Sequence, residues 1–599
     1  MCGICGIISK NKNIDNNLLE EMNDKLKHRG PNDSGIIYDE NLGLGHRRLS
    51  IIDLTSNGHQ PMEYKNRYYI VFNGEIYNYL EIKNELEKKG YKFLTKTDTE
   101  VIMAAYDYYR EKCLEIFNGM WAFALWDKQE QKLFCSRDRF GVKPFYFHKN
   151  EERILFASEI KSLLCDEKIK RIANEKIVYD YLKYGLLEHT NETFFKEIYK
   201  LPQGCYAIID KNLKLEIKKY YYLNICNDVE YTKKVDKYKE TFKNFFDSSI
   251  KLRLRSDVEI GCCLSGGLDS SAIVTELSNL LKNKSFETFS FCSQDVKTDE
   301  KKYVEYLANE KNIKTNYIYN KNIDINKIIK KVIFFQDEPF SSSSVIMSYQ
   351  IYSAARKKGI SILLDGQGAD EILCGYRKSR LYFIKLLLKK KYILRAILEF
   401  FNSLTQIKTS FNIKSDFQKI MYIFGKKIEK NKDYLNKKFL QETKGVGYNT
   451  KIDFQYNDIC HISLPVLLRY CDRNSMASSV ESRLPFLDYR LVDFCLSLPL
   501  NLKINKGYSK YILRSSIDIP PKIKNRKDKI GFAVPEKAWI KEEASELKKI
   551  FENRNFRSSR FIDNKLILEN WSKIISKNEI PHFFRYICLE LWMQVFEVK

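Results

Sequence analysis

The hydrophobic pattern of the chain changes near its middle, and this change constrains the fold more than any other feature. Up to about residue 205, short apolar runs alternate with Gly and Asn turns, as in "YYIVFNGEIYN" and "MWAFALWD". That pattern predicts packed β-sheets with few helices, which we expect only near residues 15–28, 79–89 and 98–110. From about residue 236, apolar strands alternate with helical segments instead, which predicts a doubly wound parallel sheet.

The two patterns divide the 599 residues into domains, since a chain of this length is too long for one hydrophobic core. Residues 2–205 are predicted to form an α+β domain of stacked sheets with helices outside. Residues 236–599 are predicted to form an α/β domain with added helices. The segment 206–235 is rich in Tyr and Lys without a clear period, and we interpret it as a linker. Residues 377–460 are rich in Lys and Phe and are expected to be helical.

Composition argues against several classes of protein. No apolar run approaches the ~20 residues of a membrane span, and no signal peptide is recognisable, so we expect a cytoplasmic protein without a membrane partner. The formal charge of +24 suggests nucleic-acid binding. The lysines are spread along the chain, however, with no basic arm or finger spacing, so we expect a Lys-rich surface and no nucleic-acid partner. Most of the fifteen cysteines are expected to be free thiols.

The opening "MCGIC" has two interpretations. Cys2 and Cys5 have the spacing of a redox or metal-binding pair, but no second C-x-x-C and no nearby His completes a metal site. Removal of Met1 would instead make Cys2 the first residue. Its own α-amine, with a pKa near ~8, could then accept the thiol proton and make Cys2 a nucleophile.

Four further residues of the first domain have the chemistry that acyl transfer needs. In "FNGEIYN", Asn73 and Gly74 follow an apolar strand, where a side-chain amide and a backbone N–H can stabilise an oxyanion. Arg48 offers a guanidinium for a substrate carboxylate, and Asp98 can hold a substrate ammonium while capping a helix. Taken singly, each has an ordinary alternative, because Asn-Gly is typical of a hairpin turn and Arg48 of a protein surface.

The order of these segments resembles the class II glutamine amidotransferase domain, since "MCGICGI", "HRGPND", "NGEIYN" and "GVKPFYF" follow one another over about residues 2–200. The resemblance implies an αββα sandwich of the N-terminal-nucleophile type that hydrolyses glutamine. Cys2 would attack the amide, and Asn73 with Gly74 would form the oxyanion hole. Cys5 falls where the family has another small or apolar residue, so we interpret it as packing. Glutamine would be held by Arg48, Ile51, Glu75 and Asp98.

In the second domain, "LSGGLDSS" at residues 264–271 predicts a phosphate-binding loop between a strand and a helix. Its glycines let the backbone approach a phosphate, and the N-terminus of the helix attracts the anion. The loop lacks the Lys of a P-loop, so transfer of a γ-phosphate is not indicated. Asp269 in this loop and Asp370 in "DGQGADE" could together bind Mg²⁺. The alternative for Asp370 and Glu371 is the favourable placement of acids at a helix N-terminus.

This loop resembles that of enzymes that cleave ATP between its α and β phosphates. With "DRNSMASSVESRLPFLD" and "KGYSKYILR", the whole chain resembles the glutamine-hydrolysing asparagine synthetase B family. The resemblance implies that ATP with Mg²⁺ activates the aspartate carboxylate, and that ammonia reaches it through an internal tunnel. Lys510 and Arg483 would neutralise the leaving pyrophosphate. ATP would be contacted by Leu264, Ser265, Gly266, Gly267, Asp269, Ser270, Phe291, Asp365 and Gly366.

The chain departs from the family pattern at Gln367, because the usual "GEGADE" is here "GQGADE". An amide cannot take a proton from attacking ammonia as a carboxylate can. Either Glu371 or the phosphate of the acyl-adenylate takes that role, or the acceptor differs from aspartate. Aspartate and another carboxylate, such as a uronic acid of a surface polysaccharide, therefore both stay candidates. A non-catalytic descendant is disfavoured because the residues of both sites are present. The expected partners are the small molecules glutamine, ATP and the acceptor, with a homodimer left open.

Overall fold

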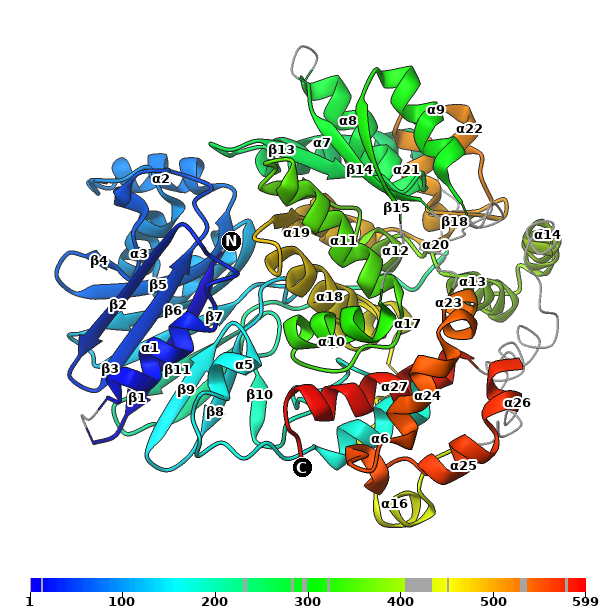
Figure 1. The fold of residues 1–599 in the computed structure, drawn as a ribbon. Coiled ribbons are helices and arrows are strands. Elements are labelled where there is room, and N and C mark those ends of the chain that lie inside the picture. The colour runs from blue at the N-terminus through cyan, green and yellow to red at the C-terminus, as the bar shows by residue number, and fades with distance from the viewer. Residues whose placement is uncertain are drawn as a thin grey trace.

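The computed structural model shows two halves side by side, with the N-terminal half as a β-rich body and the C-terminal half mostly helical (Figure 1). The structure describes residues 2–11, 14–229, 234–281, 285–292, 299–319, 324–404, 434–449, 452–527, 536–576 and 580–599. Within these residues, no helix is long and apolar enough to cross a membrane.

The N-terminal half contains two antiparallel six-stranded sheets packed face to face. The first has the order β10-β8-β9-β1-β3-β2, and its strands are β1 (Gly3–Ser9), β2 (Asp33–Asp39), β3 (Leu42–Arg48), β8 (Tyr146–Lys149), β9 (Arg153–Ala157) and β10 (Ile198–Lys200). The second has the order β12-β11-β7-β6-β5-β4, and its strands are β4 (Met62–Tyr64), β5 (Tyr68–Ile76), β6 (Gly119–Asp127), β7 (Lys132–Arg137), β11 (Cys205–Asp210) and β12 (Leu215–Lys219).

Strand β1 shows why the sheets stack in this way. Successive side chains of a strand point to opposite faces. Ile4 and Ile8 therefore pack into the core between the two sheets, whereas Cys5 and Ile7 pack into the core under the outer helices. Cys5 is a fully buried free thiol, which agrees with the packing interpretation.

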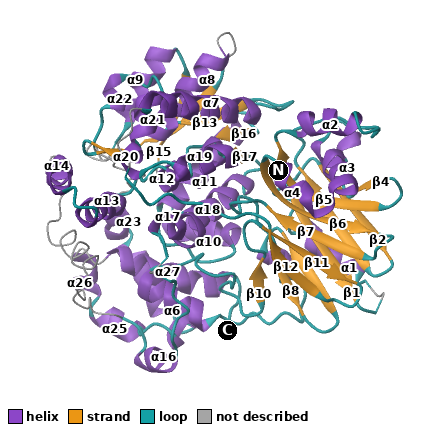
Figure 2. Ribbon diagram, turned by 180° about the vertical axis from the view of Figure 1, so that it is seen from behind, coloured by secondary structure: helices purple, strands orange, loops and turns teal. Residues whose placement is uncertain are grey.

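Helices cover the outer face of each sheet, so the predicted αββα sandwich is confirmed (Figure 2). Helix α1 (Asn16–Asp24) packs on the first sheet, and α2 (Tyr79–Glu87) and α3 (Asp98–Tyr109) belong to the layer over the second. These are the three helices that the sequence predicts. Shorter helices are η1 (Ser56–Gly58), η2 (Arg110–Lys112), α4 (Cys113–Ile116) and α5 (Ile160–Leu163), and α6 (Glu175–Tyr184) follows them.

The interpretation of 206–235 as a linker is wrong in its first part. Strands β11 and β12 occupy residues 205–219, and β11 pairs with β7 through Ala207 and Cys135. Cys205, Ala207 and Ile209 are buried while the residues between them are half-exposed. This alternation of period two is the mark of a strand, and the Tyr and Lys residues around it conceal it in the sequence.

The C-terminal half is built on a parallel five-stranded sheet of order β15-β14-β13-β16-β17, which confirms the predicted doubly wound domain. The chain first builds the sheet outward from β13 to β15 and then returns to the other side of β13. Ligands bind at such a switch point, outside the carboxyl ends of the strands. The strands are β13 (Ile260–Cys263), β14 (Glu287–Cys292), β15 (Lys314–Tyr319), β16 (Ile362–Leu364) and β17 (Glu481–Arg483).

Helices surround this sheet and extend to the C-terminus. Those before residue 377 are α7 (Val235–Arg253), α8 (Leu268–Leu281), α9 (Lys301–Lys311), α10 (Ile325–Gln336), α11 (Ser344–Lys357) and α12 (Ala369–Ile372). In the region predicted to be helical, the described helices are α13 (Arg377–Lys389), α14 (Ile393–Leu404), α16 (Lys437–Glu442), α17 (Phe454–Asn457) and η4 (Asp458–Ile462). Residues 405–433 and 450–451 of that region lie outside the described residues.

The remaining elements close the second domain. They are α18 (Leu464–Met476), η5 (Pro485–Leu487), α19 (Tyr489–Ser497), α20 (Leu500–Lys503), β18 (Ile504–Asn505), β19 (Tyr508–Ser509), α21 (Tyr511–Ser516), α22 (Pro521–Lys524), α23 (Glu536–Glu542), α24 (Ala544–Glu552), η6 (Arg557–Arg560), α25 (Asn564–Glu569), α26 (Trp571–Ser576) and α27 (Ile580–Val595). One apolar core crosses the boundary between the halves, because Trp592 of α27 packs edge-on against Phe194 and Phe195.

Candidate active sites

Cys2 lies directly before β1 and is buried beside the end of β5. Its backbone N–H donates to Asn73 Oδ1 at 3.1 Å. This hydrogen bond from the predicted nucleophile orients the side-chain amide of Asn73. Asn73 Nδ2 is buried and has no hydrogen-bond partner in the described part of the chain. A buried, unpaired donor is costly unless a ligand satisfies it. The structure therefore brings Cys2 and Asn73 together and leaves an N–H free for an oxyanion.

Position 74 has no room for a side chain and therefore requires glycine. The pairing of β5 with β6 sets Gly74 opposite Trp121, and a Cβ at Gly74 would lie 2.1 Å from the Met120 carbonyl oxygen. The backbone beside Asn73 can therefore carry no side chain. Burial raises the pKa of the Cys2 thiol, and the Arg48 cation opposes this shift only in part. A base at the site is needed to form the thiolate.

Arg48 is the last residue of β3, and Ile51 lies on the segment that follows it. The Arg48 guanidinium is buried and donates to the backbone carbonyls of Thr55 at 2.7 Å, of Ile52 at 3.3 Å, and of Asp53. In this structure Arg48 thus orders the loop of residues 52–55, and its contact with a substrate carboxylate stays a prediction. The Ile51 carbonyl accepts from the Asp257 N–H of the second domain at 3.0 Å.

Glu75 and Asp98 form a buried pair of acids next to this loop. Burial and the carboxylates of Glu481 and Asp98 hold the pKa of Glu75 well above its usual range. Burial, with the Glu481 carboxylate, raises the pKa of Asp98 to about 7, although the Ile76 N–H donates to Asp98 at 2.9 Å. The prediction that Asp98 caps α3 is wrong by one residue, because Thr97 is the N-cap. Asp98 is the first helical residue, and its carboxylate accepts from the Ile76 N–H of β5.

Arg483 does not lie at the predicted pyrophosphate site. Its guanidinium is fully buried at the domain boundary, where it donates to Glu481 at 2.5 Å and lies 3.6 Å from Glu75. It also donates to the carbonyls of Arg253 and Arg255. Arg483 therefore pairs with the acids of the predicted glutamine site and does not line the cavity that the predicted ATP residues form. Its strand, β17, is an edge strand of the sheet, and its guanidinium reaches Glu75 of the first domain.

The predicted ATP residues line a cavity of about 340 Å³ at the carboxyl ends of β13, β14 and β16. Of the predicted contacts, the lining includes Leu264, Ser265, Gly267, Asp269, Ser270, Phe291, Asp365 and Gly366. Gly266 lies behind it, with φ of +75° and with its carbonyl accepting from Arg526 at 2.9 Å. Ser265 and Ser270 close the loop by a contact of 3.1 Å between their hydroxyl oxygens.

Lys510 links the two acids that the sequence assigns to a metal. Lys510 Nζ lies 2.7 Å from Asp269 Oδ1 and 2.8 Å from Asp370 Oδ1. The two carboxylates raise the pKa of this buried Lys, so it is a fixed cation. Gly375 makes room for the arrangement, because a Cβ there would lie 1.8 Å from Asp370 Oδ1 and 2.4 Å from Lys510 Cε. Two carboxylate groups that converge on one cation are a donor set that also suits Mg²⁺.

Gln367 and Glu371 differ in their access to this cavity. Gln367 lines it, whereas the Glu371 carboxylate is buried beneath Tyr376, whose hydroxyl donates to it. Glu371 is therefore poorly placed to replace the missing acid directly. Sequence reasoning missed four cations that line the same cavity, namely Arg380, Arg514, Arg526 and Lys527. Arg514 ends the quoted "KGYSKYILR" string, but Arg380 and Arg526 stand among many lysines and give no signal of their own.

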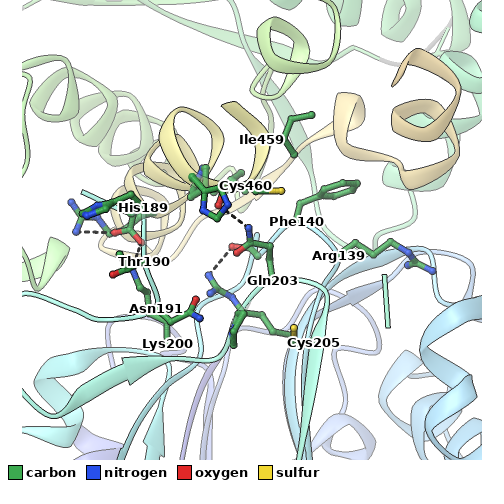
Figure 3. Close-up of a pocket in the computed structure, with 18 of the residues that line it drawn as sticks. Arg139, Phe140, His189, Thr190, Asn191, Lys200, Gln203, Cys205, Ile459 and Cys460 are labelled. Atoms are coloured by element: carbon green, nitrogen blue, oxygen red, sulfur yellow. Dashed lines mark hydrogen bonds and ion pairs between the residues drawn. The ribbon is translucent and has the colours of Figure 1, made fainter. Parts of the chain in front are cut away.

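A second cavity, of about 510 Å³, lies between the domains (Figure 3). Arg139, Phe140 and Gln203 line it from the first domain, and Ile459 and Cys460 of η4 line it from the second. Gln203 Nε2 donates to the Cys460 carbonyl at 2.9 Å across it. More than 250 positions separate these two residues, so the sequence contains no signal for this cavity.

Helix α18 forms a wall of both cavities. Tyr470 and Cys471 face the ATP cavity, while Arg469 and Asp472 face the cavity between the domains. Asp472 also accepts from Arg29 at 2.9 Å, and Arg29 Nε donates to the Cys2 carbonyl at 3.0 Å. One helix thus contacts the ATP cavity and, through a single arginine, the predicted nucleophile.

Residues 1–221 match the family described as "Glutamine amidotransferase domain", and residues 241–594 match "Asparagine synthase". With the sandwich, the cysteine site and the cavity at the switch point, these matches define a two-domain glutamine amidotransferase. "Asparagine synthetase [glutamine-hydrolyzing] 1" of Bacillus subtilis is 32% identical over 91% of this chain and 89% of its own length. The chain belongs to the glutamine-hydrolysing asparagine synthetase family, whose members use ATP as a substrate.

Other relatives carry related names. "Putative asparagine synthetase [glutamine-hydrolyzing] 2" of Methanocaldococcus jannaschii is 38% identical over 63% of this chain and 76% of its own length. "Amidase chry2" of Gibberella zeae is 26% identical over 87% of this chain and 85% of its own length. Names within this group therefore do not all specify the same acceptor.

Proposed function

We propose that the protein hydrolyses glutamine at Cys2 and transfers the ammonia to a carboxylate activated by ATP in the second domain. The observation that carries this proposal is Lys510, held between Asp269 and Asp370 beside the Ser-Gly-Gly loop. A buried cation next to a phosphate-binding loop suits the departure of pyrophosphate. We propose aspartate as the acceptor, which would give asparagine, AMP and pyrophosphate. A cytoplasmic location, where these substrates occur, is part of the proposal.

In the first half-reaction, loss of Met1 gives Cys2 a free α-amine, which takes the proton of the buried thiol. The thiolate attacks the carboxamide carbon of glutamine. Asn73 Nδ2 and the Gly74 N–H stabilise the oxyanion, ammonia leaves, and water converts the thioester to glutamate. Arg48, Ile51, Glu75 and Asp98 hold the glutamine backbone groups.

In the second half-reaction, an oxygen of the acceptor carboxylate attacks the α-phosphorus of ATP and pyrophosphate leaves. Lys510 neutralises the charge that develops on the leaving group. Asp269 and Asp370 fit a Mg²⁺ ion, which when bound would supply further positive charge to the phosphate oxygens. Ammonia then attacks the acyl carbon and displaces AMP.

A second acceptor class is favoured by one observation. Gln367 lines the cavity at the position where the family usually has an acid. An amide there cannot serve as the base that the family's acid would provide, which is compatible with an acceptor other than aspartate, such as a uronic acid. This alternative keeps both half-reactions and changes only the carboxylate.

The test is the release of pyrophosphate from ATP with glutamine, measured with aspartate and with a panel of sugar uronates. Pyrophosphate and asparagine formed together with aspartate would support the first acceptor. No release with aspartate, together with turnover of a uronate, would replace it by the second. The Cys2→Ala variant is the matched control, because it should lose the reaction with glutamine and keep the reaction with added ammonia.

A further inference from the structure

Helix α14 lies at the periphery of the second domain, away from the sheets (Figure 1). Among the described residues, its contacts with the body of the protein lie on one side of the helix. Ala396 is buried, and Glu399 accepts backbone N–H groups of Lys506 at 2.6 Å and of Gly507 at 2.8 Å. Asn402 also lies against Gly507, because a Cβ added at this glycine would be only 2.8 Å from the Cβ of Asn402. The three contact residues are three positions apart, so they define the inner face of the helix.

The opposite face of α14 is apolar and exposed. Leu394 is 78% exposed, and Leu398 and Phe401 are each 61% exposed. Their neighbours on the same face are Ile393, Ile397 and Phe400, all more than 36% exposed. Positions 393, 394, 397, 398 and 401 fall on one contiguous stripe of a helix with 3.6 residues per turn. Contiguous apolar surface of this kind marks a site of interaction.

The surroundings of this face are strongly basic. Between Arg377 and Leu404 the chain contains eight Lys or Arg residues and one acidic residue, Glu399. Because Glu399 is engaged on the inner face, it does not offset the cations around the outer one. Lys389 ends α13, and Lys390 and Lys391 lie in the turn before α14. Lys390 pairs with Asp228 at 2.9 Å, whereas Lys389 and Lys391 are exposed. We call the six apolar residues and these three lysines the α14 face.

We propose that the α14 face binds the surface of an anionic lipid bilayer. A helix with bulky Leu, Ile and Phe side chains on one face and adjacent lysines lies in the plane of a membrane interface. The alternative occupant, a second copy of the chain, is disfavoured by charge. A two-fold interface would set the same basic patch against itself, and the like charges would repel. The proposal concerns peripheral binding and requires no membrane-spanning helix.

The α14 face is connected to the ATP cavity. Helix α13 precedes α14 and carries Arg380, which lines that cavity. Ala396 of α14 shares a small apolar core with Phe383 and Leu387 of α13. A bilayer bound at α14 would therefore be one helix away from the acceptor site. This inference goes beyond the proposed function and is independent of which carboxylate is the acceptor.

The test is the sedimentation of the purified full-length protein with vesicles of phosphatidylglycerol and phosphatidylethanolamine. We expect the protein to bind these vesicles and to bind pure phosphatidylcholine vesicles much less. The Leu394→Ser, Phe401→Ser double variant should bind about tenfold more weakly, because two bulky side chains no longer enter the interface. The Lys389→Gln, Lys391→Gln variant should weaken binding and reduce its dependence on salt.

The matched control is Leu94→Ser, which removes a side chain that is 90% exposed in the first domain and should leave vesicle binding unchanged. Glutaminase activity and circular dichroism show whether each variant is folded, and neither depends on lipid. Absence of binding by the unmodified protein, or equal binding by the α14 variants, would overturn the proposal. A third outcome would also overturn it: light scattering shows that the unmodified protein is a dimer and the α14 variant a monomer, and neither protein binds vesicles.

Discussion

The guanidinium of Arg483 lies 3.6 Å from the carboxylate of Glu75, and these residues belong to different domains. The backbone of Arg483 contributes to the other site, because its carbonyl accepts the Asp365 N–H at 2.9 Å. Asp365 begins the loop that lines the ATP cavity. One residue is therefore attached through its side chain to the predicted glutamine pocket and through its main chain to the ATP cavity.

Replacement of Arg483 should affect the predicted glutamine pocket more than the ATP cavity. Arg483→Met leaves Glu481 and Glu75 buried without their cation, and loss of one partner of a buried pair costs about 3–5 kcal/mol. We expect a lower free energy of unfolding in urea and a raised KM for glutamine. Adding Glu481→Gln should recover part of the stability, because it removes one uncompensated charge. Equal stability of the single and double variants would contradict this account.

Asn73→Ala tests the oxyanion hole. The substitution removes the unpaired Nδ2 donor and should lower kcat of the glutaminase reaction by about 10²–10³. The reaction with added ammonia should be unchanged, since it bypasses Cys2. Steady-state kinetics with both nitrogen sources separates these effects. If both reactions fell together, the role of Asn73 would be in the stability of the domain.

The pH dependence of glutamine binding should follow Asp98. Its pKa of about 7 means that the carboxyl is neutral at lower pH and cannot pair with a substrate ammonium. The value of kcat/KM for glutamine should therefore rise with pH through about 7. Because the folded pKa is raised above the ordinary 3.8, this group lowers stability as pH rises between the two values. Asp98→Asn should remove that loss of stability and raise KM at every pH, so a persistent rise of kcat/KM through pH 7 in the variant would assign the titration to another group.

Gly375→Ala should damage only the second site. The added Cβ would meet Asp370 Oδ1 at 1.8 Å and Lys510 Cε at 2.4 Å, so the carboxylate and the ammonium would have to move. We expect a loss of acceptor-dependent pyrophosphate release of at least ~10-fold, from misplacement of the cation. The glutaminase activity of the same protein is the internal control, and an unchanged rate of pyrophosphate release would show that the Lys510 bridge is dispensable.

Gln367→Glu restores the acid that the family usually has at this position. If aspartate is the acceptor and ammonia needs a base, the variant should form product faster with ammonia, by about 10²-fold or more. Formation of asparagine is measured directly with ammonia, ATP and aspartate. No gain would indicate that Gln367 has no part in proton transfer or that aspartate is not the acceptor, which the uronate panel distinguishes.

Much of the fold was predictable from hydrophobic periodicity. Helices α1, α2 and α3 and the change to a parallel sheet follow from patterns of period 3.6 and two, whereas α6 of the first domain was not predicted. Strand β11 was missed because two of its buried positions hold the small residues Cys205 and Ala207, while the larger Tyr206 and Ile208 occupy the half-exposed positions. The exposed stripe of α14 has a helical period, but the sequence alone cannot show which face of a helix meets the protein.

The site was predictable only where its residues share a motif. Cys2, Asn73, Asp269 and Lys510 lie in recognisable strings, and the structure places each beside its expected neighbours. Arg483 also lies in such a string, but its role depends on Glu75, which is 408 positions away in the chain. A contact between residues so far apart in the sequence depends on how the two domains pack, so no local sequence pattern predicts it.

Helix α18, which lines both cavities, has a consequence for chimeras in which related proteins exchange domains. Arg29 of the first domain is buried between Glu159 and Asp472, and Asp472 belongs to α18. A chimera that took one domain from a relative would break this arrangement unless residue 29 and α18 travelled together. The two domains differ in fold and in chemistry, but Arg29 joins the residue predicted to be the nucleophile of one domain to a helix of the other.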